Sequence, residues 1–450
     1  MTIENREDGA LNSRQVDRRT FIKTTGVAAG VAAGIEGILA ARQAPAHAQG
    51  VTINMVRWAD FVPASDKLLR EEVLPKAEKA LKATIKLETI NANDIQSKIT
   101  AAIEGGGGPD IIMTQHNWQH LYEKGVVEVG DVAEKIAKAQ GGFYKQSRDV
   151  ATSGGRFIAV PWSVVGLMIA YRKSWLAEEG AMKFPTNWEE YRTLGKKLKA
   201  KGRPIGQTMG HTFGDAPAFS YPYLWSWGGA EVDAKGKVVL NSKETLESVK
   251  FMTAFWKDAH DEGGLAWDDS NNNRAFLSGS ICATLNGASI YIESLRNPDK
   301  YKTDKGEQMK TDILHSPLPR GPKGQFAYHV PFSHMVMKYG KNQKLAKDLL
   351  LWLGTKENFE PWFLSQKGFS VGATTDWEKH SVWKEDPIML PYKDAARLGR
   401  APGFAGPPNA KAAEVQTKYI ITDMYAKAIQ GMAADESVKW AGSELKKIYG

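Results

Sequence analysis

The stretch EGGGGPDIIMTQHNW, from Glu104 to Trp118, decides how this chain is expected to fold. It follows a segment with isoleucine at positions 95, 99 and 103, a spacing that places these side chains on one face of a helix. The glycines end that helix and allow a sharp turn. Residues 110–114 are then predicted as a buried strand, with polar and aromatic residues 115–118 at its carboxyl end. A phosphate-binding loop is a poor alternative, because that motif enters a helix through Gly-Lys-Ser/Thr, whereas Pro109-Asp110 enters a strand.

The elements before this stretch complete an alternating order. Residues 51–56 and 83–90 are predicted strands, and residues 66–81 and 94–103 are predicted helices. The order strand, helix, strand, helix, strand predicts an α/β fold with mostly parallel sheets flanked by helices. Ligands of such sheets bind beyond the carboxyl ends of the strands. We therefore expect residues 115–118 to face a cleft.

The rest of the chain continues with strands and helices in the same style. A helix is predicted to start near residues 185–190, with Asn187 or Thr186 as its cap. Residues 209–229 are rich in aromatic side chains and are predicted to be irregular, and residues 402–408 to form a loop. Further strands are expected at 156–162, 166–171, 280–285 and 332–337, and further helices at 246–260, 345–353, 410–432 and 437–449.

Composition narrows the functional classes. The chain has 450 residues, 42% of them hydrophobic, which is enough for two or three cores. Its one cysteine, Cys282, excludes an internal disulfide and a cysteine-based metal centre. The formal charge of +8 is spread along the chain, so nucleic acid is not an expected partner. His116 and His120 are spaced four apart, but two histidines without a carboxylate make a weak metal site. We expect a monomer without metal or cofactor.

The first fifty residues resemble an export address. Arg18 and Arg19 precede an apolar pair, a weakly apolar segment follows, and Ala46-His47-Ala48 has the small-x-small pattern of a cleavage site. This arrangement resembles a twin-arginine signal peptide over residues 1–48, cleaved near Ala48. A membrane anchor is the alternative, but Glu36 and Arg42 interrupt the apolar run. The mature protein is therefore expected in the periplasm.

Several short motifs carry a resemblance to a known family. They are the glycine run with Pro109–Ile112, and the segments 121–128, 155–161, 168–173, 185–190, 275–280 and 286–287. Together they make the mature chain similar to bacterial extracellular solute-binding proteins of the family that includes the maltose-binding protein. Arg172, and Ala288-Ser289 where many sugar binders have an aromatic residue, depart from that family's pattern.

The resemblance implies a two-lobed periplasmic binding protein fold of type II, with a hinge between the lobes. One lobe would comprise residues 51–165 plus 288–340, and the other residues 166–287 plus 341–450. It also implies a function as the periplasmic substrate-binding component of an ABC importer. The protein would close over a small ligand and then dock on the permease subunits at the inner membrane.

Side chains near the predicted strand ends supply the candidate ligand site. A sugar needs hydrogen-bond partners for its hydroxyls and flat rings for its C–H faces, which Asp, Asn, Gln and Trp provide together. Asp60 is the expected acceptor for vicinal hydroxyls, Trp118, Trp162 and Trp225 the expected stacking rings, and Gly287 lets the backbone approach the ligand. The full candidate set is Trp58, Asp60, Gln115, Asn117, Trp118, Trp162, Ser163, Asp215, Trp225, Asn286, Gly287, Ser289 and His334.

Alternatives remain open at this point. Asp60 could cap the helix near Asp66, and each tryptophan could belong to a core. The ligand could be a polyamine or, because Arg57 and His116 lie near the predicted rim, an anionic molecule. A periplasmic carbohydrate-active enzyme is a further alternative, for which Asp60 and Asp215 are the only carboxylate pair to offer. We expect binding without catalysis, because no hydrolase, metalloprotease or dinucleotide motif occurs in its required context.

Overall fold

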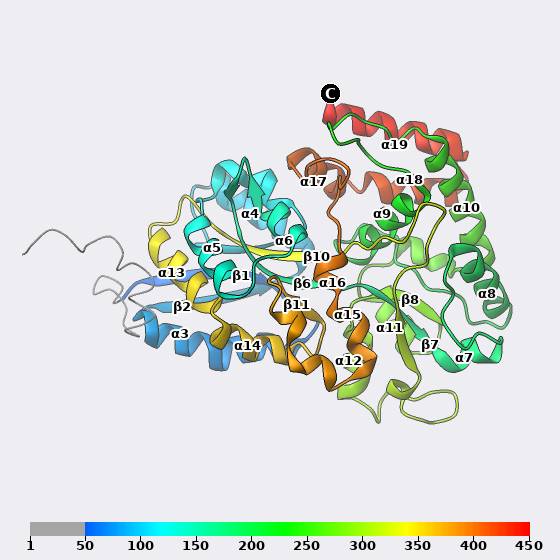
Figure 1. The fold of residues 1–450 in the computed structure, drawn as a ribbon, viewed down its shortest axis with the longest axis horizontal. Coiled ribbons are helices and arrows are strands. Elements are labelled where there is room, and N and C mark those ends of the chain that lie inside the picture. Colours follow the sequence, from blue (N-terminus) through cyan, green and yellow to red (C-terminus); the bar gives the residue numbers. More distant parts are fainter. Residues whose placement is uncertain (1–49) are drawn as a thin grey trace, which may run out of the picture. The chain divides into compact units, whose positions relative to one another are not determined.

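The computed structural model describes residues 50–450 as a mixed α/β protein (Figure 1). The predicted signal peptide, with Arg18, Arg19 and the cleavage site near Ala48, lies outside the described residues. Most predicted elements are present, with shifted ends. The α-helices are α2 (Pro63–Leu68), α3 (Leu74–Leu81), α4 (Ile95–Glu104), α5 (Gly130–Ala139), α6 (Lys145–Ala151), α7 (Lys173–Glu178), α8 (Trp188–Ala200), α9 (Asp215–Trp227), α10 (Lys243–Ala259), α11 (Asn271–Leu277), α12 (Ser289–Arg296), α13 (Gln343–Leu353), α14 (Lys356–Ser365), α15 (Leu390–Lys393), α16 (Ala395–Leu398), α17 (Ala410–Thr417), α18 (Ile420–Ile429) and α19 (Ala434–Tyr449).

A six-stranded sheet contains the opening stretch. Its order is β11-β6-β10-β3-β1-β2, from β1 (Thr52–Trp58), β2 (Thr84–Ile90), β3 (Ile111–Gln115), β6 (Val160–Val165), β10 (Val330–Val336) and β11 (Ser370–Gly372). The first three strands are parallel, as their alternation with helices predicts.

The prediction of mostly parallel sheets is wrong for the other strands of this sheet. β10 runs antiparallel to both β3 and β6, and β11 runs antiparallel to β6. These strands do not follow the strand–helix–strand repeat of the first hundred residues, because the chain leaves the sheet after β6 and returns to it through β10.

A second, three-stranded sheet is antiparallel throughout. Its order is β8-β7-β9, from β7 (Met168–Arg172), β8 (Ala283–Asn286) and β9 (Ile313–Ser316). Only Gly166 and Leu167 separate β6 of the first sheet from β7 of the second. A short hairpin outside both sheets pairs β4 (Thr152–Ser153) with β5 (Arg156–Phe157).

Two segments of the chain belong to a different sheet from the one expected for their predicted lobe. β9, inside the range 288–340 of the predicted first lobe, pairs with β7 of the second sheet. β11, α13 and α14 fall in the range 341–450, yet they pack on β6, β10, α2, α3 and α5 around the first sheet. At these places the sheet pairing differs from what the predicted ranges suggest, because strand partners in space are not visible from chain position. The lobe ranges themselves stay a prediction.

Helix α9 replaces the irregular segment that was predicted for residues 209–229. Its side chains are buried on all sides, so no polar face marks the helical period in the sequence. Pro222 inside the helix further hides the pattern. By contrast, α8 begins as predicted, with the Asn187 Oδ1 accepting a hydrogen bond from the Glu190 backbone N–H at 2.9 Å.

The C-terminal helices connect the two halves of the described chain. α18 packs against α9, α10 and α19, whereas α17 contacts α18, α19 and also the 3₁₀ helix η4 (Trp118–Gly125), which directly follows β3 and Asn117. α17 therefore lies between elements of both sheets' surroundings (Figure 1). Within residues 50–450, no helix combines the length and apolar character needed to cross a bilayer.

Candidate functional site

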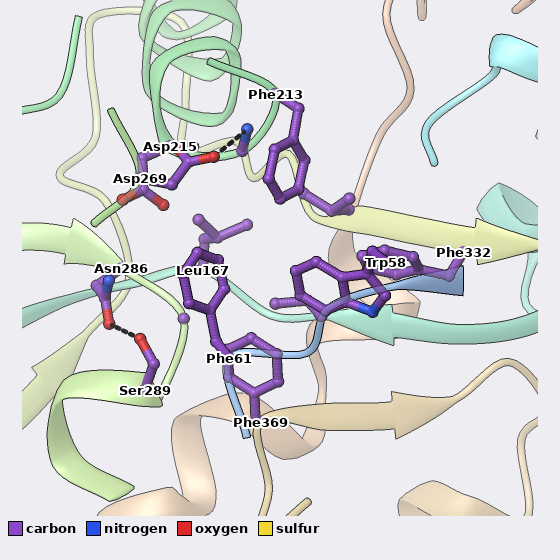
Figure 2. A pocket seen from close by; sticks show the side chains of 14 residues that line it. Trp58, Phe61, Leu167, Phe213, Asp215, Asp269, Asn286, Ser289, Phe332 and Phe369 are labelled. Atoms are coloured by element: carbon purple, nitrogen blue, oxygen red, sulfur yellow. Dashed lines mark hydrogen bonds between the residues drawn. The ribbon is translucent and has the colours of Figure 1, made fainter. Parts of the chain in front are cut away.

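A pocket lies where the ends of the two sheets meet, and it is lined by residues from both (Figure 2). It contains about 350 Å³ of space outside the atoms, although only a small part admits the centre of a water molecule. The walls therefore stand close together. The lining residues are Trp58, Phe61, Val165, Leu167, Phe213, Gly214, Asp215, Asp269, Asn286, Gly287, Ser289, Val330, Phe332 and Phe369.

One wall of the pocket is aromatic, with Trp58 at its centre. The Trp58 ring centroid lies 4.8 Å from that of Phe332 and 5.8 Å from that of Phe213. Phe61 and Phe369 complete the cluster, at 5.6 Å and 6.1 Å from Trp58. Trp58 is the last residue of β1, so the strand end carries the indole into the pocket. This wall offers ring faces to a ligand, with the indole N–H as its polar group.

The opposite wall carries two buried carboxyl groups at the start of α9 (Figure 2). The Asp269 carboxylate accepts three hydrogen bonds, from the Thr212 hydroxyl at 2.7 Å and from the backbone N–H groups of Gly214 and Asp215 at 3.0 and 2.8 Å. Asp269 therefore caps the helix. The Asp215 carboxylate accepts a hydrogen bond from the Asn272 side-chain amide at 2.5 Å.

The two carboxyl groups have raised pKa values. Burial is the main cause for both, and for Asp215 the neighbouring Asp269 carboxylate is the second cause. The Asp269 charge is stabilised by three donors, so we place the excess proton of the pair on Asp215. An empty pocket therefore favours a neutral Asp215, and a partner that stabilises its charge would favour the ionised form.

A closed polar network borders the carboxyl groups. The Asn286 amide donates to the Asn273 Oδ1 at 2.6 Å, Asn273 donates to the Ser289 hydroxyl at 3.0 Å, and Ser289 donates to the Asn286 Oδ1 at 3.0 Å. The network fixes Asn286 and Ser289 at the start of α12. Gly287 leaves room for the aromatic wall, because a Cβ there would lie 2.7 Å from a ring carbon of Phe369.

Five of the thirteen candidate residues line this pocket. They are Trp58, Asp215, Asn286, Gly287 and Ser289. The structure places the other eight elsewhere: Asp60, Gln115, Asn117, Trp118, Trp162, Ser163, Trp225 and His334.

Asp60 has the structural role that the sequence left as an alternative. Its carboxylate accepts hydrogen bonds from the Val62 backbone N–H at 2.8 Å, from the Ser65 hydroxyl at 3.0 Å and from the Gln366 amide at 2.9 Å. It thereby holds the turn that leads into α2. Burial, assisted by the Asp66 charge, raises the pKa of Asp60 to about 6.

Trp162 and His334 lie on the face of the first sheet that points away from the pocket. They surround Arg57, whose guanidinium lies 5.0 Å from the Trp162 ring centroid and 3.3 Å from the His334 Nε2. Arg57 and Trp58 are neighbours in β1, and successive strand side chains point to opposite faces. Arg57 therefore does not border the pocket. It was one of the two residues, with His116, on which the alternative of an anionic ligand was based. Ser163 is buried within β6, opposite Phe332.

The residues after β3 hold other parts of the chain against the first sheet. The Trp118 indole N–H donates to the Gln416 Oε1 at 2.8 Å, and the Asn117 amide donates to the Asn409 carbonyl at 3.4 Å. His116 donates through Nε2 to the Phe213 carbonyl at 2.7 Å, and burial lowers its pKa to about 3. Gln115 is buried at the end of β3, and the Trp225 indole donates to Glu231.

Sequence reasoning missed much of the aromatic wall and Asp269. Phe332 begins a predicted strand, and Phe213 lies in the aromatic segment 209–229, so both positions carried a signal in the sequence. Phe61 and Phe369 occupy turns without a periodic pattern. The Asp268-Asp269 pair ahead of α11 was a readable capping signal, although it gives no hint that Asp269 caps a distant helix.

Comparison with known proteins places the fold. Residues 62–358 match the model of the family described as bacterial extracellular solute-binding protein. An ABC transporter-binding protein of Deinococcus radiodurans is 24% identical over 247 residues, which cover 53% of this chain and 55% of that relative. A binding protein of Brucella abortus is 23% identical over 297 residues, which cover 64% of this chain and 68% of that protein. The match thus spans only about half the length of the first relative.

Solved structures show the same two-lobed architecture. Maltose-bound MalE3 of T. maritima has a TM-score of 0.73 at 20% identity, covering 88% of this chain and 100% of its own. A solute-binding protein of Thermotoga lettingae with α-D-tagatose has a TM-score of 0.74 at 16% identity, covering 89% and 99%. One from Agrobacterium radiobacter with ribitol has a TM-score of 0.69 at 20% identity, with the same coverage. At these identities the likeness establishes the fold alone.

Proposed function

The chain belongs to the bacterial extracellular solute-binding proteins, and on that premise we propose that it is the periplasmic substrate-binding component of an ABC importer. It captures a small carbohydrate or polyol between two lobes and delivers it, as a monomer, to permease subunits in the inner membrane. Residues 1–48 act as the export signal. The ligands of the structural neighbours, which are maltose, ribitol and tagatose, support this ligand class.

The observation that carries the proposal is the origin of the pocket walls. Trp58 and Phe332 come from the first sheet, whereas Asp215, Asn286 and Ser289 come from elements around the second. A ligand in this pocket therefore touches both halves at once. A molecule that contacts both halves only in the closed form shifts the equilibrium toward closure.

We propose that this site binds its ligand and does not catalyse a reaction. Asp60 does not line the pocket, so only one carboxyl group of the pair considered for glycoside cleavage, that of Asp215, faces it. Asp215 and Asp269 lie beside each other on one wall, whereas a glycosidase places its carboxyl groups on either side of the scissile bond (Figure 2). Incubation with a panel of glycosides is expected to yield no product, and turnover of any member would contradict this part of the proposal.

The proposed function is tested with the purified protein and a ligand panel. Thermal unfolding is followed with monosaccharides, disaccharides, polyols, sugar acids and polyamines, and titration calorimetry is applied to those that stabilise. A ligand at 100 times its Kd is expected to stabilise the folded state by about 2.7 kcal/mol. A panel in which no carbohydrate or polyol, aminated derivatives included, raises the melting temperature would contradict the proposal.

The contact between η4 and α17 is expected to tune affinity. Trp118→Phe removes the indole N–H that bonds Gln416 and leaves most of the ring packing. If this bond forms only on closure, affinity should fall roughly 2- to 13-fold, which corresponds to a hydrogen bond of about 0.5–1.5 kcal/mol. Calorimetry with a ligand from the panel measures the change.

Trp188→Phe is the matched control. It removes an indole hydrogen bond to the Ser226 hydroxyl at 2.9 Å, between α8 and α9 within the surroundings of the second sheet. The control is expected to lower stability by a similar amount and to leave affinity unchanged. Equal affinity losses in both variants would show that the Trp118 bond has no special part in closure.

A further inference from the structure

The two walls of the pocket differ sharply in chemistry. The rings of Trp58, Phe213, Phe332 and Phe369, together with Phe61, cover one side, and the polar side chains are confined to the other (Figure 2). A neutral sugar carries hydroxyls around its whole ring. On the aromatic side, only the Trp58 indole N–H could pair with them, and buried hydroxyls without partners weaken binding.

The polar wall has negative charge without a positive partner. No lysine, arginine or histidine is among the residues that line the pocket. Within residues 50–450, neither Asp215 nor Asp269 takes part in an ion pair. Asp269 is occupied as a helix cap, whereas Asp215 is approached only by the uncharged amides of Asn272 and Asn286. Asp215 is 4% exposed, and its carboxyl group lies at the pocket.

A cation satisfies both walls at once. A protonated or methylated nitrogen is attracted to the faces of aromatic rings, most strongly to tryptophan, and its C–H groups pack on them as an apolar surface. The same charge compensates a buried carboxylate, which is otherwise costly to ionise. The hydroxyls of such a ligand would then be held at one end, by Asn286 and Ser289.

We infer that the natural ligand carries a basic nitrogen, as an aminated sugar or polyol does, and that the nitrogen lies between Asp215 and the ring of Trp58. This inference rests on the proposed function and narrows it. Asn286 and Ser289 pair with the hydroxyls of the ligand by exchanging hydrogen bonds of their network with Asn273 for bonds to the ligand. Asp269 keeps the start of α9 in place.

The test compares amines with neutral partners of the same shape. The purified protein is titrated with glucosamine and glucose, galactosamine and galactose, N-methylglucamine and glucitol, and choline and its carbon isostere dimethylbutanol. At least one amine is expected to bind tenfold or more tightly than its neutral partner. Asp215→Asn is expected to remove that preference, lowering the affinity of the amine at least tenfold and that of the neutral partner less than threefold.

Asp60→Asn is the matched control, because Asp60 is an equally buried carboxyl group outside the pocket. The control is expected to keep the preference for the amine, and thermal unfolding confirms that both variants are folded at the titration temperature. Neutral partners that bind as tightly as the amines would overturn the inference and leave the proposed function standing. A preference that survives Asp215→Asn overturns the role of Asp215. If no carbohydrate or polyol binds in any form, the proposed function fails, and this inference fails with it.

Discussion

Replacing Trp58 with alanine is expected to weaken ligand binding about 30-fold or more and to lower the free energy of unfolding by about 3–5 kcal/mol. Trp58 is 3% exposed and lies at the centre of the aromatic wall, in contact with Phe61, Phe213, Phe332 and Phe369. Its removal takes the largest ring from the ligand and leaves a void among the others. Calorimetry measures the first effect and denaturant unfolding the second.

Trp162→Ala separates the two effects. Trp162 is 5% exposed in the same sheet but faces Arg57 on the other side. It is expected to cost similar stability while leaving affinity nearly unchanged, in whatever fraction of the protein is folded. Trp58→Phe and Trp162→Phe repeat the comparison if the alanine variants unfold. Equal affinity in both pairs of variants would exclude Trp58 from the ligand site.

Mild acid is expected to destabilise the unliganded protein between pH 6 and 5, by about 1.4 kcal/mol per pH unit for each proton of net uptake on unfolding. Burial lowers the pKa of six histidines, so the unfolded chain takes up protons below about pH 6.5 that the folded chain does not. These histidines stabilise the fold at neutral pH, and that stability is lost as the pH falls. They are His116, His120, His260, His315, His329 and His334.

Four buried carboxyl groups act in the opposite direction. Burial raises the pKa of Asp60, Asp215, Glu231 and Asp269, so their contribution is lost as the pH rises through the folded pKa and regained in acid. The six histidines outnumber the four carboxyl groups, so we expect a net uptake of protons on unfolding, and acid then destabilises the folded protein. Urea unfolding at pH 7.5, 6 and 5 measures the slope. A stability that is level or increases toward pH 5 would contradict the balance.

The sequence predicted the start of the fold because its signals are local. The isoleucines of α4, the glycine turn and the strand after Pro109 follow one another without need of a distant partner. Pairing between distant strands is not local, so the antiparallel β10 and the sheet membership of β9 and β11 could not be read from the chain.

Only some of the residues that line the pocket could be predicted from the sequence, again because local signals were the only ones that could be read. Position at a strand end predicted Trp58, Asn286 and Gly287. Trp162 and His334 do not line this pocket, because the alternation of their strands turns their side chains to the other side of the sheet. Trp118 and Asp60 do not line it either, because they form long-range hydrogen bonds with Gln416 and Gln366. Such partners, about 300 positions away, leave no trace in local patterns.

Leu167 lies in the two-residue passage between the sheets and also lines the pocket. If residues 166–167 serve as a hinge in the proposed closure, a bound ligand lies next to that hinge. At a hinge, a small increase in the size of the ligand is expected to move the two halves apart by a larger distance where they meet farther from it. On the proposed function, we therefore expect a ligand with one substituent too many to hinder closure more strongly than its added volume alone suggests.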